Sequence, residues 1–410
     1  MEQKTLGMDA RPARGGPLFS LHEKIDICRG LFAFLVVAAH AFELTSLLNP
    51  GWGEPLPWAL RNFLGYGAGN GVYYVMGFFV ISGYCIQASV SRLSRDGEFP
   101  LKTYLAARAT RILPLYYAAL LFAIGVEHVA RTWFDRPAIW GNGVSRSVLV
   151  YQTLLIQNFT QTFGSFGASW SITNEVVYYV LFGLLAALCA PLRFRPAVAG
   201  MGLCVVVGAA LQIAYRGGLR TPAVLGTGLL FGLGVNWFLG ALVAAFQSSL
   251  PRSPLLRKVA AAWPLVFALS MAIWCAQSVH QEFVFMTSGL AFTLMLIHFI
   301  IQEHDAPPAS PRPARRWVEL LGLSSYPMYL FHGPVLLLVG AVVKETGAVI
   351  PWWLFWPAAT LFTIVCCLPL GVVLERPLMN WRAGVLRRLK TAKATRETAA
   401  GVRPALDVQQ

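Results

Sequence analysis

The run DICRGLFAFLVVAAHAFELTSL at residues 26–47 has the apolar character of a membrane-spanning helix, yet it contains Arg29 and His40. At about 100° per residue, the eleven steps between them make roughly three turns, so both side chains project from one face. The helical rise between them is roughly 16 Å, about half of the hydrocarbon thickness. Because membrane anchoring does not require such a pair and its burial costs free energy, the pair indicates a functional site.

The composition of the chain is that of an integral membrane protein. Of its 410 residues, 56% are hydrophobic and 13% are charged, and the mean hydropathy is +0.57, far from the balance of soluble domains. We therefore expect an all-α, polytopic membrane bundle of about ten transmembrane helices. The apolar runs that predict these helices lie near 26–47, 67–90, 112–130, 171–190, 197–215, 224–246, 262–277, 284–302, 325–343 and 352–374.

The positive charges predict the orientation of these helices. Of 33 Lys and Arg residues, 26 fall in the six segments that the map places in the cytoplasm, with Arg29 counted in the first, and seven fall in outer loops. Because Lys and Arg are enriched in cytoplasmic segments, this division predicts that both termini are cytoplasmic. Anchoring beside an anionic leaflet also accounts for the net charge of +14 without nucleic acid.

The chain divides into three expected parts. Residues 1–24 lack an apolar core and indicate a disordered cytoplasmic leader, residues 25–380 form the membrane domain, and residues 381–410 form a basic, polar cytoplasmic tail. Residues 303–316 are a Pro-rich basic linker between two helices. The seven cysteines lie in or beside expected helices at spacings that match no metal site, so we expect packing residues and no metal.

Polar residues recur at the outer start of the fourth expected helix. Ser171 and Glu175 lie one turn apart, and Tyr178 and Tyr179 follow. Helix capping explains Ser171 well. It explains Glu175 less well, because a desolvated carboxylate one turn inside the helix needs a partner.

Two further helices carry polar residues near their cytoplasmic ends. Arg108 and Arg111 are one turn apart, which suits membrane anchoring and equally suits bidentate phosphate binding. Tyr329 and His332 are also one turn apart, and for His332 taken alone structural hydrogen bonding is the simpler explanation. His298 has no polar neighbours in the sequence, so we interpret it as structural.

Six motifs in this order resemble the acyltransferase 3 family of integral membrane proteins, and the resemblance extends from about residue 22 to residue 380. The motifs are Arg29-x10-His40, Phe78-Phe79-Val80-Ile81-Ser82-Gly83-Tyr84, Arg108-x-x-Arg111-Ile112-x-Pro114-Leu115-Tyr116-Tyr117, Ser169-Trp170-Ser171-x-x-x-Glu175, Ser325-Tyr326-x-x-Tyr329-Leu330-x-His332 and Glu375-Arg376-Pro377. No single motif is decisive, but six in the same order are highly specific.

The resemblance implies transfer of an acyl group, typically acetyl from acetyl-CoA, to hydroxyls of carbohydrates such as lipopolysaccharide or exopolysaccharide. It implies that His40 and Glu175 are catalytic and that Arg29, Arg108 and Arg111 bind the acyl donor or hold the site together. It further implies a bacterial inner (plasma) membrane protein that uses acyl-CoA as co-substrate, with no bound cofactor. Some members carry an additional hydrolase-like domain, and we expect this chain to be a stand-alone member.

The chemistry of acyl transfer suits these residue types, because the acceptor hydroxyl needs a base and the tetrahedral oxyanion needs stabilisation. We expect His40 to be the base and Glu175 to orient it, with both at nearly the same depth and facing each other directly or through one water. Ser82 has no base near it in sequence and no Gly-x-Ser-x-Gly motif occurs, so we expect it to pack and the acyl group to transfer directly. The side chains that could line the site are those of Ser171, Tyr178, Tyr329 and His332.

Two other functions remain open at this point. Buried His, Glu and Arg residues also suit a proton-coupled transporter. Transporters usually have two halves with broken helices at corresponding positions, and the segments 26–190 and 197–374 show no such correspondence. A scaffold or sensor without chemistry would leave the placement of Arg29 and His40 on one helix face unexplained. The acceptor is not identified either. The largest outer loop, 131–168, could stack on sugar rings or anchor at the membrane surface through Arg131, Trp133, Arg136, Trp140, Tyr151 and Phe163.

Overall fold

The structure of the protein is a computed structural model that describes residues 18–93, 98–134, 144–159, 164–192, 195–276, 281–306 and 315–399. Within these ranges the chain forms helices and no strand, which confirms the expected all-α architecture. The helices are α1 (Leu21–Leu48), α2 (Trp58–Asn62), η1 (Phe63–Ala68), α3 (Gly71–Leu93), α4 (Leu101–Trp133), α5 (Arg146–Thr153), η2 (Gln157–Phe159), η3 (Gly164–Ser169), α6 (Trp170–Cys189), α7 (Pro196–Arg216), α8 (Pro222–Ala245), η4 (Leu250–Arg252), α9 (Pro254–Ala261), α10 (Trp263–Ala276), α11 (Gln281–Asp305), α12 (Arg316–Thr346), α13 (Trp352–Cys367), η5 (Gly371–Glu375) and α14 (Arg376–Ala399).

Nine helical stretches among the described residues are long and apolar enough to cross a membrane. The pair α9 and α10, bent by 47° at its break, makes a tenth if it is counted as one span. The polytopic bundle is therefore confirmed. The last apolar stretch continues from α13 through η5 into α14, so the expected tail is helical as far as residue 399. Most of the expected leader, the centre of the 303–316 linker, parts of the 131–168 loop (Arg136, Trp140 and Phe163 among them) and the last eleven residues lie outside the described ranges.

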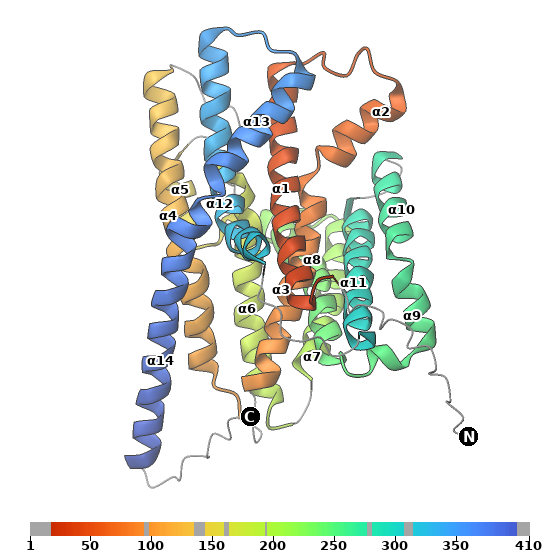
Figure 1. Cartoon of the computed structure of the whole chain (residues 1–410), viewed down its shortest axis with the longest axis vertical. Coiled ribbons are helices and arrows are strands. Elements are labelled where there is room, and N and C mark those ends of the chain that lie inside the picture. The colour runs from red at the N-terminus through yellow and green to blue at the C-terminus, as the bar shows by residue number, and fades with distance from the viewer. Residues whose placement is uncertain are drawn as a thin grey trace, which may run out of the picture.

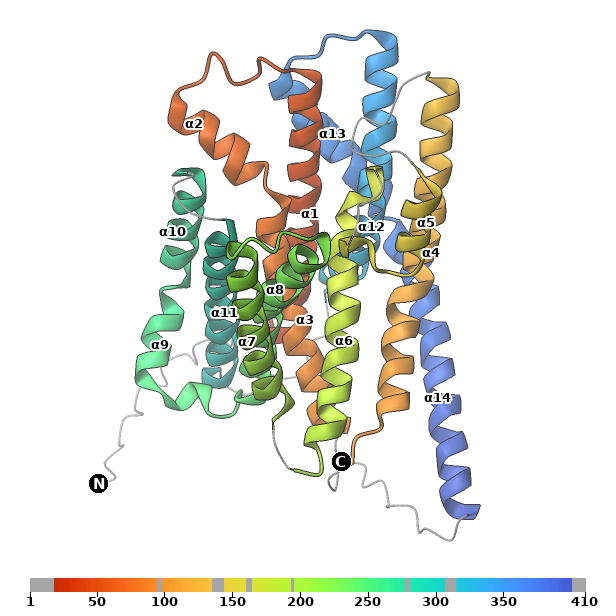
Figure 2. The same ribbon diagram turned by 180° about the vertical axis from the view of Figure 1, so that it is seen from behind.

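The helices are arranged around α1, α3 and α12 (Figures 1 and 2). The helices α4 and α14 lie side by side at one edge of the bundle, and α9, α10 and α11 lie at the opposite edge in both views. Residues of α1 contact α3, α12 and α13, and residues of α3 contact α8 and α6. Most of the candidate site residues lie on the faces of α1, α3, α4, α6 and α12 that point into the bundle.

The start of α1 is defined by a capping box. Ser20 accepts a hydrogen bond from the backbone N–H of Glu23, and the Glu23 carboxylate accepts one from the backbone N–H of Ser20 at 2.9 Å. The same end is tied to α11, because the Leu21 N–H donates to Glu303 at 3.1 Å and Lys24 donates to Gln302 at 3.0 Å. These contacts set the depth at which Arg29 enters the bundle.

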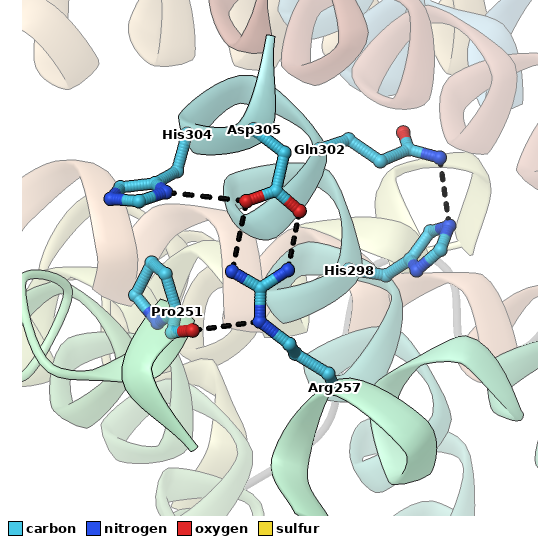
Figure 3. Close-up of polar contacts among 6 residues, drawn as sticks. All are labelled: Pro251, Arg257, His298, Gln302, His304 and Asp305. Carbon is cyan, nitrogen blue, oxygen red and sulfur yellow. Dashed lines mark hydrogen bonds and ion pairs between the residues drawn. The ribbon is translucent and has the colours of Figure 1, made fainter. Parts of the chain in front are cut away.

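A second polar cluster ties α9 to α11 (Figure 3). The guanidinium of Arg257 forms a fork with the carboxylate of Asp305, and its Nε donates to the Pro251 carbonyl at 2.7 Å. His304 also contacts Asp305, whereas His298 faces Gln302 one turn away at 2.9 Å. The cluster is partly exposed and positions helices; it lies apart from the cavity described below.

The crossing of α3 and α8 depends on two glycines. A Cβ on Gly83 would lie 1.9 Å from the carbonyl oxygen of Trp237, and a Cβ on Gly240 would lie 1.9 Å from that of Val80. Small residues at such crossings allow backbones to approach closely, which drives helix association in membranes. The close approach holds Ser82, the neighbour of Gly83, against the buried Trp237 side chain.

Candidate functional site

A cavity lies between α1, α3, α4, α6, α12 and α14. Its wall combines apolar side chains of α3 with a group of polar ones that come from all six helices. These polar residues are Arg29, Ser82, Arg108, Arg111, Ser171, Glu175, Tyr179, Ser325, Tyr326, Tyr329 and Arg382. Among the residues that line it, four are arginines and one is a carboxylate, so the cavity suits an anionic ligand.

Two of the arginines have acidic partners within the protein. Arg29 lies 3.6 Å from Asp26, one turn away on α1. Arg111 forms an ion pair with Glu375, whose side chain is only 1% exposed, and its guanidinium lies over the ring of Tyr326 at 5.6 Å. Arg111 therefore neutralises a buried carboxylate and also lines the cavity, a double role that its sequence position does not reveal.

Glu175 is held by hydroxyl groups. Ser82 donates to its Oε1 at 2.7 Å, and Tyr179, one turn away, donates to the same oxygen. Ser82 in turn accepts a hydrogen bond from the indole N–H of Trp237 at 3.2 Å. The expectation that Ser82 only packs was wrong, because its hydroxyl faces the cavity and bonds the one carboxylate in the cavity wall.

The other expected catalytic residue, His40, is paired with His332. The Nε2 of His332 lies 3.2 Å from the Nδ1 of His40, and the ring centroids are 4.9 Å apart. His332 is fully buried at 1% exposure, whereas His40 is partly buried. His332 thus forms the hydrogen bonds that the simpler interpretation from sequence expects, and one of its partners is the expected base.

The partners of each ring define its tautomer. The Nδ1 of His332 lies 2.7 Å from the Tyr329 carbonyl and 3.2 Å from the Met328 carbonyl. Carbonyls only accept, so this nitrogen bears the proton and Nε2 bears the lone pair. The Nδ1 of His40 faces that lone pair and, at 3.0 Å, the Val36 carbonyl, so it too bears the proton. The lone pair of His40 is therefore on Nε2, which has no hydrogen bond within the described part of the chain.

No direct hydrogen bond or ion pair joins His40 and Glu175 among the described residues, so a contact through one water, the other expected form, stays a prediction. Tyr329 lines the cavity and is also a neighbour of His332. Its hydroxyl donates to the Ala168 carbonyl at 2.9 Å and contacts Ser171 at 2.7 Å in the cavity wall, while its ring lies 6.0 Å from that of His332. Neither His40 nor His332 lines the cavity, so Tyr329 is the lining residue that connects it to the histidine pair.

Similar depth alone does not bring two side chains into contact, because the neighbours of His40 also depend on which helices pack against α1. The helix that carries His40 begins at Leu21, four residues before the expected membrane domain, and α6 is preceded by the 3₁₀ turn η3. Helix α12 also packs against α1 and places its own side chains beside His40. Among the possible lining residues, Ser171 and Tyr329 reach the cavity, whereas the buried Tyr178 hydroxyl donates to the Leu230 carbonyl at 2.6 Å and helps pack α6 on α8.

Three residues of this site were not predicted from the sequence. Ser82 and Glu375 lie in two of the six motifs, but their partners Glu175 and Arg111 are 93 and 264 positions away along the chain. Arg382 falls in the expected tail, where a basic residue is simply one of many. No group of three or more His, Cys, Asp or Glu side chains in the described ranges is placed to hold a metal ion.

The fold and the cavity together define a polytopic membrane protein with an internal, cationic binding site beside a histidine pair. The chain belongs to the acyltransferase 3 family, whose model, described as an acyltransferase domain, matches residues 22–372. The protein is thus a membrane-embedded acyltransferase. Searches of curated proteins and of solved structures found no match.

Proposed function

We propose that the protein transfers an acyl group, acetyl in the simplest case, from acyl-CoA to a hydroxyl of a carbohydrate or lipid-linked saccharide. One observation carries the proposal: a cavity lined by four arginines is also lined by Tyr329, whose ring lies 6.0 Å from that of His332, the partner of His40. A polyanionic donor and a neutral imidazole base are what acyl transfer from a thioester to an alcohol requires.

The donor and the acceptor approach from opposite sides in this proposal. The basic segments that the positive charges assign to the cytoplasm include the start of α4, where Arg108 and Arg111 lie, and α14. Acyl-CoA from the cytoplasm would place its phosphates among the arginines and its thioester beyond Tyr329. The acceptor would reach His40 from the outer half of α1.

The proton steps follow from the tautomer of His40. Its Nε2 takes the proton of the acceptor hydroxyl as the hydroxyl oxygen attacks the thioester carbonyl. When the tetrahedral intermediate collapses, the carbon–sulfur bond breaks and the same Nε2–H returns the proton to the departing thiolate. Throughout, Nδ1–H donates to His332, whose lone pair stabilises the positive charge that His40 holds in between.

Glu175 has a different part in this scheme from the one expected. His332 orients the imidazole, and Glu175 is the acidic group of the donor cavity, held by Ser82 and Tyr179. Its carboxylate offsets part of the positive charge of the arginines where the thioester would pass. In this scheme Glu175 is a positioning residue for the donor.

The experiment that tests the proposal uses purified protein, labelled acetyl-CoA and a saccharide acceptor from the cell surface. His40→Asn keeps an amide nitrogen near the position of Nδ1 and removes Nε2, so transfer should fall to background while the folded fraction stays the same. His298→Asn, on α11 and away from the cavity, is the matched control. A His40→Asn protein that transfers acetyl at the normal rate would show that another group is the base.

A proton-coupled transporter is the competing function, because it could use the same buried charges. Vesicles that contain the protein discriminate between the two. Covalent modification of an acceptor supports the acyltransferase, whereas proton-dependent uptake of an unmodified substrate, with no transfer, supports the transporter.

A further inference from the structure

The four arginines of the cavity fall into two classes. Arg29 and Arg111 have carboxylates beside them, as described above. Arg108 and Arg382 have no ion pair with any described residue, and the Nε of each is buried without a hydrogen-bond partner. The guanidinium of Arg108 lies over the ring of Tyr104 at 5.5 Å, a contact that orients it and does not neutralise it.

These two guanidiniums belong to one cavity. Both side chains line it, and they come from helices α4 and α14, which pack against each other. Two partly buried cations without counter-charges repel each other and lose hydration, so their approach costs free energy when the cavity is empty. An anion between them removes both costs, and phosphate oxygens match the N–H groups of guanidinium in geometry and charge.

The position of Arg382 in the chain makes it informative. It lies on α14, near the end of the last stretch that could cross a membrane, Trp352–Arg388, and ten residues beyond the end of the family match at 372. The two views show α14 lying against α4, the helix of Arg108 (Figures 1 and 2). The ion pair between Arg111 of α4 and Glu375, the residue before α14, holds the two helices together at this point.

We infer that Arg108 and Arg382 together form the phosphate subsite of the donor, and that α14 thereby selects phosphate-bearing donors over phosphate-free thioesters. The inference rests on the proposed function, since it assumes that the cavity receives acyl-CoA. It extends the donor site beyond the arginines of α1 and α4 to α14, in the last stretch that could cross the membrane. Arg382 is a binding residue in this scheme and has no contact with the reacting atoms.

The test compares two donors, acetyl-CoA and S-acetylpantetheine, which has the same thioester arm and no phosphate. The measured quantity is the ratio of kcat/KM for the two donors in the purified full-length protein. Arg382→Ala should lower this ratio by about 10- to 100-fold through a higher KM for acetyl-CoA, as expected for lost charge-assisted hydrogen bonds. Arg382→Lys should recover only part of the ratio, because lysine lacks the planar fork. The control is Arg388→Ala, an exposed position on the same helix that does not line the cavity.

Other outcomes separate the inference from the function on which it rests. If Arg382→Ala leaves the ratio at the wild-type value, or lowers activity with both donors equally, the phosphate subsite is wrong although the acyltransferase stands. If the wild-type protein transfers from neither donor, the proposed function fails. The subsite is then judged by calorimetric binding of CoA to the wild-type and Arg382→Ala proteins, where equal affinities would overturn it.

Discussion

Replacement of His332 by phenylalanine should lower kcat by about 5- to 13-fold. The ring would fill the same buried space but could not accept the proton of His40 Nδ1, now 3.2 Å from His332 Nε2. A neutral hydrogen bond is worth about 0.5–1.5 kcal/mol and one to a charged group about 1.5–3 kcal/mol. In the proposed mechanism His40 becomes charged during the reaction, so losing the acceptor raises the activation barrier by the difference between these two hydrogen-bond energies, about 1–1.5 kcal/mol. This increase corresponds to a kcat about 5- to 13-fold lower.

The assay is steady-state acetyl transfer with both substrates varied, because a positioning role lowers kcat and leaves both KM values near the wild-type ones. His332→Gln should restore most of the rate, since its amide oxygen can occupy the place of Nε2 and accept the same proton. His298→Phe on α11 is the control for replacing a histidine in a membrane helix. A His332→Phe enzyme with kcat within twofold of the wild type, or equal losses in the Phe and Gln variants, would refute the orienting role.

Three further predictions follow from the same structure. Reporter fusions after residues 150 and 220 should be external and those after 95 and 258 internal, and an internal reading at 150 would overturn the orientation. Arg111→Ala should destabilise the protein by about 3–5 kcal/mol in thermal denaturation, because the Glu375 carboxylate would remain buried and unpaired. The double variant Arg111→Met with Glu375→Leu should be more stable than Arg111→Ala, and an Arg111→Ala protein as stable as the wild type would show that the ion pair is not needed. Glu175→Gln keeps the shape but weakens two charge-assisted hydrogen bonds, so the donor should be positioned less well and kcat/KM for acetyl-CoA should fall about tenfold. A wild-type kcat/KM for acetyl-CoA would remove Glu175 from the site.

The sequence predicted the fold well because membrane spans depend on local composition. Every expected span has a helix in the structure, and the one ambiguity, near residues 262–277, coincides with the bent pair α9 and α10. An apolar run of about twenty residues must form a helix in lipid, whatever its neighbours are, since no water satisfies its backbone. The count of nine or ten therefore follows from the sequence without any tertiary information.

The partners within the site could not be predicted in the same way. Arg29, Arg108, Arg111 and Glu175 do line one cavity, as expected of residues serving one site. The partner of His40, however, is 292 positions away in sequence, and helix depth alone cannot say which neighbouring helix faces a given residue. The rotation of each helix depends on packing, as at the glycine crossing of α3 and α8, and that packing placed His332 where we expected Glu175.

The pair of histidines has one more consequence, for the route that a proton can take. A proton that reaches Nε2 of His40 could in principle pass on through Nδ1 to His332, but among the described residues the far nitrogen of His332 faces only the backbone carbonyls of Met328 and Tyr329. Carbonyls of the peptide backbone do not take up protons, so the chain of donors and acceptors ends there. The pair therefore exchanges protons with its surroundings only through Nε2 of His40, whereas proton-driven transport needs a continuous chain of proton donors and acceptors. Each proton must leave through the atom by which it came, so the protein can return it to a leaving group but cannot conduct it across the membrane by this path.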